Sequence, residues 1–249
     1  KGIWCVPKYA NPTGITYSDD VVRRFANLRP AAPDFRIFWD NAYAVHGFTE
    51  KDTPLLNIFD ALAEVGGDDL VYEFGSTAKV TFPSSGMAYV TASAADMAEI
   101  RGAFSVMRVS PEKFSQLAHV LFLKNLDGVK AHMRAHAAIV GPRFALVEQK
   151  LTEGLGELGC ATWTHPTGGY FVSFDGPEGS AKAIVKLAAD LGVKMTPAGA
   201  TWPSGKDPHD TNIRIAPTYP SLDELSRALD VFVVAVRLVS ARLAKAARA

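Results

Sequence analysis

Residues 70–86, with the sequence LVYEFGSTAKVTFPSSG, join an apolar run to a lysine. The run Leu70–Phe74 has the length of a strand, and Gly-Ser-Thr-Ala follows it directly before Lys79. Lysine is rarely buried, yet a strand is expected here to deliver one toward the interior. The stretch therefore marks Lys79 as a candidate functional residue.

Similar apolar runs, separated by segments of helical pattern, lie on both sides of this strand. We expect strands at Gly2–Pro7, Phe35–Trp39, Leu70–Phe74 and Met87–Thr91, and helices at Asp19–Leu28, with Ser18 as N-cap, and at Pro54–Val65. Strands that alternate with helices are typical of parallel strands joined by crossover connections. The first part of the chain is therefore predicted to form an α/β sheet.

The pattern changes after Ala94, where apolar residues recur with a helical period. We expect helices at Asp96–Met107, Pro111–Leu123, Gly128–Leu158, Ser180–Leu191 and Ser221–Ala247, and strands at Ala161–Thr164, Tyr170–Phe174, Val193–Thr196 and Asn212–Ala216. Mixed short strands and helices indicate an α+β arrangement. We place a domain boundary near residue 140, so that residues 1–140 form an α/β domain and residues 141–249 a smaller α+β domain.

Composition excludes several classes of function. The 249 residues carry 26 basic and 26 acidic side chains, and this balance argues against nucleic acid or an anionic membrane as a partner. No apolar stretch is long enough to cross a membrane. Cys5 and Cys160 fit no metal or redox spacing, so we expect buried free thiols in a reducing compartment and a cytoplasmic protein.

Polar residues follow the first three predicted strands, where ligands bind in open α/β sheets. Asn11, Asp40 and Lys79 occupy these places, and Tyr43 lies three residues after Asp40. Taken alone, Asp40 is most often a cap or turn residue, Tyr43 a core aromatic residue and Lys79 a solvated loop residue. Together they suit pyridoxal phosphate, which needs an amine for a Schiff base, a carboxylate opposite the pyridine nitrogen, and phenol and amide donors near the ring oxygen.

These residues lie in motifs that recur in one known family. Asn11-Pro12-Thr13-Gly14, Asp40-Asn41-Ala42-Tyr43 and Ser76-Thr77-Ala78-Lys79, followed by Pro166–Phe171 and Asn212–Ala216, stand in the order found in class I aminotransferases. The chain thus resembles the fold-type I pyridoxal-phosphate enzymes. The stretches WDNAYAVHGF (39–48) and FGSTAKVTF (74–82) are most similar to a bacterial aspartate aminotransferase-like subgroup.

The resemblance implies both a fold and an activity. The fold would be an incomplete large domain with a mixed, mostly parallel sheet, followed by a small α+β domain. The activity would be amino-group transfer from aspartate or another dicarboxylic amino acid to 2-oxoglutarate, through a Schiff base of Lys79 with pyridoxal 5'-phosphate. Arg214 would hold the substrate α-carboxylate beside Asn11. Members of the family are homodimers, and no metal is expected.

The phosphate site departs from the family pattern. The family usually has an arginine about eight residues after the lysine, whereas Val80–Met87 contains none. Ser76, Ser84 and Ser85 offer hydroxyl and backbone donors in its place. The family's N-terminal part, with its glycine-rich phosphate-binding turn, is absent from this sequence, so the chain resembles a C-terminal fragment.

Two other functions stay open at this point. The chain could be the effector domain of an aminotransferase-like transcription regulator, or an inactive fragment that lacks the N-terminal cofactor cradle. Three histidines are further candidates for a functional role. His132 and His136 are four residues apart, but solvated or packing roles are favoured over a metal site. His46 follows Tyr43 closely and either approaches the cofactor or packs in the core.

Overall fold

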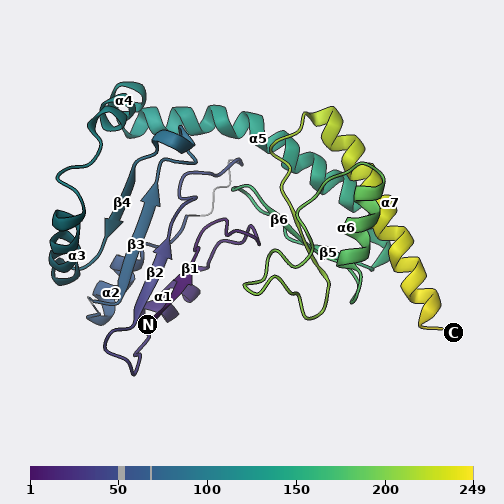
Figure 1. Ribbon diagram of the computed structural model, residues 1–249, viewed down its shortest axis with the longest axis horizontal. Helices are drawn as coiled ribbons and strands as arrows, with labels where there is room; N and C mark the ends of the chain where they lie inside the picture. The colour runs from purple at the N-terminus through teal and green to yellow at the C-terminus, as the bar shows by residue number, and fades with distance from the viewer. Residues whose placement is uncertain (50–53, 68, 249) are drawn as a thin grey trace. The chain divides into compact units, whose positions relative to one another are not determined.

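The computed structural model describes residues 1–49, 54–67 and 69–248. The chain forms two compact units, one of Lys1–Lys8 with Ile15–Ala135 and the other of Tyr9–Gly14 with His136–Ala249. Figure 1 shows the elements of each unit. The predicted domain boundary near residue 140 stays a prediction.

The first unit is built on a four-stranded sheet with the order β1-β2-β3-β4. The strands are β1 (Gly2–Cys5), β2 (Arg36–Asp40), β3 (Val71–Ser76) and β4 (Ala88–Thr91). The first three are parallel, whereas β4 runs antiparallel to β3. Only a turn and the short 3₁₀ helix η1 (Pro83–Ser85) separate β3 from β4, too little chain for a parallel crossover. The predicted mixed, mostly parallel sheet is confirmed.

Two helices cover one face of this sheet. These are α1 (Asp19–Ala26), whose predicted N-cap Ser18 accepts from Val21 N, and α2 (Ile58–Val65), which ends at Gly66 in the left-handed conformation. The buried core between helices and sheet consists of Cys5, Val22, Ala26, Ile37, Trp39, Ile58, Ala61, Leu62, Leu70 and Val71. This burial holds β1, β2 and β3 in register, so their carboxyl ends lie at one edge.

The opposite face of the sheet carries aromatic rings. Trp4, Phe38 and Phe74 lie nearly parallel, with centroid distances of 5.6 Å from Trp4 to Phe38 and 5.8 Å from Trp4 to Phe74. At the start of β2, Arg36 forms a two-point ion pair with buried Asp96, which lies in the first turn of α3 (Ala94–Met107).

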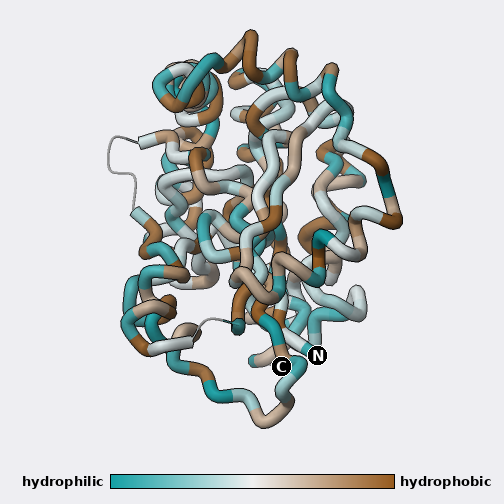
Figure 2. The backbone as a smooth tube through the Cα atoms, turned by 90° about the vertical axis from the view of Figure 1, so that its left-hand side faces the viewer, coloured by the Kyte–Doolittle hydropathy of each residue, from teal (hydrophilic) through white to brown (hydrophobic). Residues whose placement is uncertain are grey.

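The chain continues through α4 (Lys113–Leu123) into the long helix α5 (Leu126–Leu155), which contains Pro142 and is followed by η2 (Gly156–Leu158). Hydrophobic and hydrophilic residues are mixed along the helices, as the colours in Figure 2 show. Among the described residues no helix is long and apolar enough to span a membrane.

The second unit has an antiparallel sheet with the order β5-β6-β7, the short helix α6, the long helix α7 and the C-terminal part of α5. Its elements are β5 (Thr162–Trp163), β6 (Val172–Asp175), α6 (Ala181–Asp190), β7 (Asn212–Ile215) and α7 (Leu222–Ala246). Buried Phe174 of β6 meets Phe232 of α7 edge to face at 5.0 Å. This packing fixes the sheet that carries Arg214.

Two sequence expectations are wrong in detail. Val193–Thr196 forms no strand, because a strand needs a hydrogen-bonded neighbour and neither described sheet contains this segment. Cys5 is a buried free thiol as expected, but Cys160 is only half-buried. Burial raises the pKa of the Cys5 thiol, while its hydrogen bond with Tyr17 lowers it, and the net effect is a raised pKa.

Candidate active site

Lys79 lies in a turn three residues beyond the end of β3. Val80 N and Thr81 N both donate to Thr77 O at 2.8 Å, which folds the backbone around the lysine. The lysine side chain itself is exposed. The expectation that a strand delivers it into the interior is therefore wrong, because β3 ends at Ser76 and the chain turns before it reaches Lys79.

Tyr43 and Lys79 come together in the first unit, although 36 residues separate them. Lys79 Nζ donates to the phenol oxygen of Tyr43 at 2.7 Å and lies 4.1 Å from the centroid of its ring. Tyr43 is only 2% exposed, so burial fixes the position of its phenol. An amine held on a buried phenol has a defined direction and a partner for proton transfer.

Asp40 is the last residue of β2 and lies beside the exposed aromatic rings. Its Oδ2 accepts from Trp4 Nε1 at 3.3 Å. The sequence analysis did not identify Trp4 as a partner of Asp40, although the register of the sheet places both residues on the same face. Trp4 pairs with Phe38 in the parallel sheet, and Asp40, two residues later, points to the same face.

The three predicted phosphate-binding serines belong to one closed loop. Ser76 Oγ accepts from Ala78 N at 3.0 Å, and Ser84 and Ser85 lie exposed in η1. The loop closes because Thr77 N donates to Met87 O and Met87 N donates to Thr77 Oγ1, each at 2.8 Å. Its hydroxyl and backbone donors are the groups that a phosphate would need in place of an arginine.

Asn11 and Arg214 come together in the second unit, 203 positions apart in sequence. Arg214 Nη1 donates to Asn11 Oδ1 at 2.8 Å, and the guanidinium carbon lies 4.6 Å from the centroid of Phe171. Arg214 Nε is buried and has no hydrogen-bond partner among the described residues. A guanidinium with an unsatisfied buried N–H fits a carboxylate ligand, which would accept from it.

Glycines let the Asn11 turn approach the second predicted turn closely. Gly14 has φ +69°, and a Cβ there would lie 3.0 Å from Pro166 Cβ. Gly169 has φ +79°, and a Cβ there would lie 2.6 Å from Tyr9 Cβ. The two motif turns therefore pack backbone to backbone, an arrangement that a side chain at either glycine would disturb.

Asp207 organises the loop that leads into β7. Its carboxylate accepts from His209 N at 3.0 Å, Thr211 N at 2.8 Å and Asn212 N at 2.9 Å. Burial raises the pKa of this carboxyl group and the backbone N–H groups lower it, with a net result below its ordinary value. The loop fixes the start of the strand that carries Arg214.

The histidines have structural partners. His46 is 4% exposed, and its Nε2 lies 3.0 Å from Lys79 O, so it packs beside the lysine backbone. His132 Nε2 lies 2.7 Å from Val80 O, and His136 Nε2 lies 3.3 Å from the phenol oxygen of Tyr170. Within the described part of the chain no group of His, Cys, Asp and Glu side chains could hold a metal ion.

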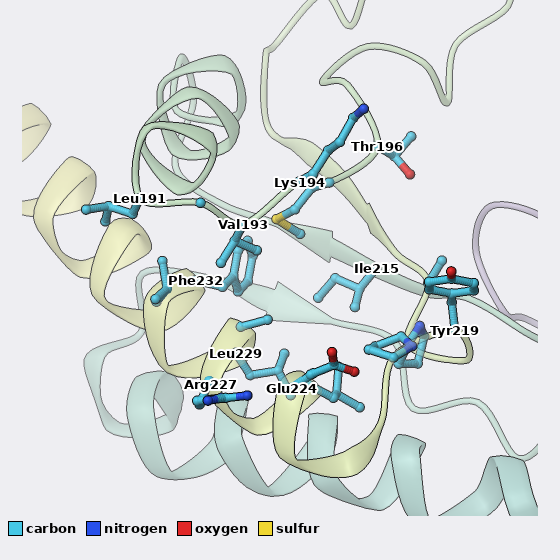
Figure 3. A pocket seen from close by; sticks show the side chains of 18 of the residues that line it. Leu191, Val193, Lys194, Thr196, Ile215, Tyr219, Glu224, Arg227, Leu229 and Phe232 are labelled. Carbon is cyan, nitrogen blue, oxygen red and sulfur yellow. The ribbon is translucent and has the colours of Figure 1, made fainter.

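A pocket of about 630 Å³ lies in the second unit, which sequence reasoning did not predict. Figure 3 shows Val193, Ile215 and Phe232 around it, while the amine of Lys194 points away. Its lining is largely apolar, and Arg214 is among the residues that line it. The segment wrongly predicted to be a strand forms one wall of this pocket.

Comparison with known proteins identifies the family. The model of the family described as aspartate amino-transferase matches residues 1–248. The aspartate aminotransferase of Corynebacterium glutamicum is 39% identical over 241 residues, which are 97% of this chain and 56% of that protein. A candidate aminotransferase of Mycolicibacterium smegmatis is 46% identical over 230 residues, 92% of this chain and 54% of that protein.

Solved structures agree with this result. An aspartate transaminase from Corynebacterium glutamicum superposes with a TM-score of 0.94 at 38% identity, over 97% of this chain and 57% of that chain. An aspartate aminotransferase from Thermus thermophilus with maleate shares the fold, with a TM-score of 0.72 at 18% identity over 94% of this chain and 56% of that chain. The chain spans little more than half the length of the relatives it matches. It belongs to the aspartate amino-transferase family, as its motifs predicted.

Proposed function

We propose that the chain forms part of a pyridoxal-phosphate-dependent aminotransferase that uses aspartate and 2-oxoglutarate. The observation that carries the proposal is the 2.7 Å hydrogen bond from Lys79 to the buried Tyr43, in a chain that matches the aspartate amino-transferase family. Bound pyridoxal phosphate would supply an aldehyde for the lysine and a ring that withdraws electrons from the substrate α-carbon.

Three residues of the first unit would serve the cofactor. Lys79 is the amine that would hold it and would then carry the proton to and from the substrate carbon. Tyr43 orients that amine through its phenol oxygen. Asp40 would face the ring nitrogen and keep it protonated, and its hydrogen bond from Trp4 fixes the direction of the carboxylate.

The phosphate group would lie at the closed loop after Lys79. Ser76, Ser84 and Ser85 would contribute hydroxyl and backbone donors there. The chemistry of this donor set fits a phosphate, which accepts several hydrogen bonds. With no cationic side chain in Val80–Met87, the loop would bind the phosphate by hydrogen bonding alone.

Arg214 would bind the substrate α-carboxylate. Its guanidinium is held from one side by Asn11 and rests against Phe171, while its buried Nε has no protein partner among the described residues. A carboxylate could accept from two guanidinium N–H groups at once, a geometry that lysine cannot reproduce. Asn11 would then orient the arginine through the hydrogen bond that its side-chain oxygen accepts.

The choice of substrate rests on the relatives. The matched Corynebacterium glutamicum protein is named an aspartate aminotransferase, and an Amycolatopsis orientalis relative, 30% identical over 218 residues, is named a (S)-3,5-dihydroxyphenylglycine transaminase. That second relative is covered over only 47% of its length. The greater similarity to the first favours aspartate, with an amino acid and a 2-oxo acid as the small-molecule partners and a homodimer as the active form.

The test uses the full-length gene product with added pyridoxal phosphate. Borohydride reduction followed by peptide mass mapping should place the label on Lys79, and aspartate with 2-oxoglutarate should yield glutamate. Lys79→Ala should lose the label and lower kcat by about a thousandfold or more. Lys194→Ala, which removes a lysine of the second unit, is the control. Transamination at the normal rate by Lys79→Ala would overturn the proposal.

The two other functions predict different results in the same experiment. A regulator domain would take up cofactor at Lys79 but would not convert aspartate. An inactive fragment would leave Lys79 unlabelled when residues 1–249 alone are treated in the same way. Glutamate formation with the label on Lys79 contradicts the regulator when the full-length protein gives it, and contradicts the inactive fragment when residues 1–249 alone give it.

A further inference from the structure

The turn that carries Lys79 starts like a helix but cannot continue as one. Val80 N and Thr81 N both bond to Thr77 O, which is the first hydrogen-bonded turn. In a continuing helix, Lys79 O would accept from the N–H of residue 83. That residue is Pro83, which has no N–H. The carbonyl beside the candidate catalytic amine therefore depends on a donor from elsewhere in the fold.

Histidines from two separate segments reach this backbone. His46, after β2, places Nε2 3.0 Å from Lys79 O, and His132, on α5, places Nε2 2.7 Å from Val80 O. A carbonyl oxygen only accepts hydrogen bonds, so in both contacts the imidazole N–H must be the donor. Figure 1 shows the start of α5 close to the turn that follows β3.

A third histidine holds the ends of the same turn. His119, on α4, is 8% exposed, and its Nδ1 lies 2.6 Å from Ser115 O, so Nδ1–H donates there. Its Nε2 then accepts, and it lies 2.6 Å from Thr81 Oγ1 and 2.9 Å from Thr77 Oγ1. Thr77 is also the residue that closes the loop onto Met87.

We propose that His46, His119 and His132 form a histidine clamp that positions residues 77–81 and thereby aims the Lys79 amine. They act as positioning residues, because His46 and His132 contact backbone carbonyls of residues 79 and 80, and His119 contacts the hydroxyl groups of Thr77 and Thr81. The inference rests on the proposed function of Lys79. It goes further in assigning a role to three histidines that the chemistry of transamination does not require.

One turn connects the clamp to Tyr43. His46 N donates to Tyr43 O at 3.1 Å, and the two rings meet edge to face at 5.6 Å. The same turn thus holds Lys79 at both ends, its carbonyl through His46 and its amine through Tyr43. A shift of the lysine backbone would lengthen the amine–phenol contact, which is how a distant histidine affects the reaction.

Substitutions at His132 separate hydrogen bonding from packing. His132→Phe keeps a flat ring against Phe122, which His132 meets edge to face at 5.2 Å, but leaves Val80 O without this donor. His132→Gln places an N–H near the same position. We expect His132→Phe to lower kcat about tenfold with KM for aspartate nearly unchanged, and His132→Gln to recover most of the rate. His209→Phe, at an exposed histidine bonded to Glu178, is the control and should leave both constants unchanged.

A second measurement reports on the loop without catalysis. Reductive labelling with pyridoxal phosphate and cyanoborohydride gives the rate at which Lys79 reacts, with the other lysines of the same sample as internal standards. We expect about tenfold slower labelling of Lys79 in His132→Phe, with the other lysines unchanged. Amide hydrogen exchange should speed up at Val80 and Thr81 but not in β2 or β3, because a purely structural defect would affect the strands as well.

The outcomes separate the two proposals. No label on Lys79 in the wild-type protein would overturn the proposed function. If Lys79 is labelled in the wild type, and His132→Phe shows the same labelling rate and the same amide hydrogen exchange, the histidine clamp is overturned and the proposed function is not. If His132→Phe does not fold, His132→Asn replaces it, since it is polar but too short to reach Val80 O. Equal behaviour of the Asn and Gln variants would then refute the clamp.

Discussion

Two regions of the molecule hold candidate functional side chains in different ways. The lysine region, made of residues 76–87 with Asp40 and Tyr43, presents its amine from an irregular turn. The arginine region, made of Asn11, Phe171 and β7, presents its guanidinium from a strand. The strand needs little more than its own ladder and the Asp207 loop, whereas the turn depends on side chains from three other segments.

The comparison shows that the precision of a site does not follow from regular secondary structure alone. Arg214 gets its position from backbone pairing with Ser173, which any strand of this length provides. Lys79 gets its position from imidazole donors, which only specific side chains provide. Damage to one region should therefore leave the other intact. Gly169→Ala tests this expectation, and two further substitutions measure how much a single contact contributes to each region.

The largest effect is expected for Gly169→Ala in the arginine region. The glycine has φ +79°, and an added Cβ would lie 2.6 Å from Tyr9 Cβ, so both strain and a clash result. The Asn11 turn should be displaced, and kcat/KM for aspartate should fall about a hundredfold, roughly 2.7 kcal/mol. The labelling rate of Lys79 should stay as in the wild type. A loss of Lys79 labelling would show that the two regions are not independent.

A smaller effect is expected for Asp207→Asn. The asparagine amide has one oxygen that can accept from the backbone, but its NH₂ group would face backbone N–H groups, which are also donors. The free energy of unfolding should therefore fall by about 2 kcal/mol at neutral pH. The native carboxyl group has a pKa below its ordinary value of 3.8. Its stabilising effect is thus complete above that value and is lost as the pH falls through the lower, folded pKa.

Urea unfolding of wild type and Asp207→Asn across this pH range measures the prediction. The difference in unfolding free energy should shrink as the pH drops below 3.8, because the wild-type carboxyl group then becomes neutral as well. A difference that stays constant with pH would show that the negative charge contributes nothing to the loop.

The smallest effect is expected for Trp4→Phe, which removes the hydrogen-bond donor to Asp40 of the lysine region. The ring stack with Phe38 survives, but Asp40 loses the 3.3 Å hydrogen bond from the indole. Because this contact is exposed, kcat should fall only about two- to fivefold, with KM for aspartate unchanged. Steady-state kinetics of the full-length protein give the answer, and a fall of a hundredfold would mean that Trp4 does more than orient the carboxylate.

Much of the fold could be predicted from the sequence because its signals are local. The apolar runs that became β1, β2 and β3 have strand length, and Ser18 caps α1 as expected. The expected strand at Val193–Thr196 failed because a short apolar run does not show whether a partner strand exists. The expectation that a strand delivers Lys79 toward the interior failed for a similar reason, since the end of β3 at Ser76 depends on where pairing with β4 stops.

The candidate site was predictable only in part. Motif spacing grouped Lys79 with Tyr43, and the structure brings these two together. The partners in the histidine contacts could not be predicted from the sequence, since His46 and His132 lie 33 and 52 positions from the carbonyls that they reach. No periodic pattern encodes contacts of that kind. The absence of an N–H at Pro83 is the one local signal that a distant donor was needed.

The tryptophans of the first sheet also give it an optical asymmetry. Trp4 is 62% exposed on the aromatic face, whereas Trp39 is 1% exposed in the core on the other face. An aqueous quencher such as acrylamide therefore reaches the first fluorophore and not the second. The difference in emission between the wild type and Trp4→Phe isolates the light from the indole bonded to Asp40. The fluorescence of Trp4 would therefore report changes around Asp40, at this edge of the sheet, without any added dye.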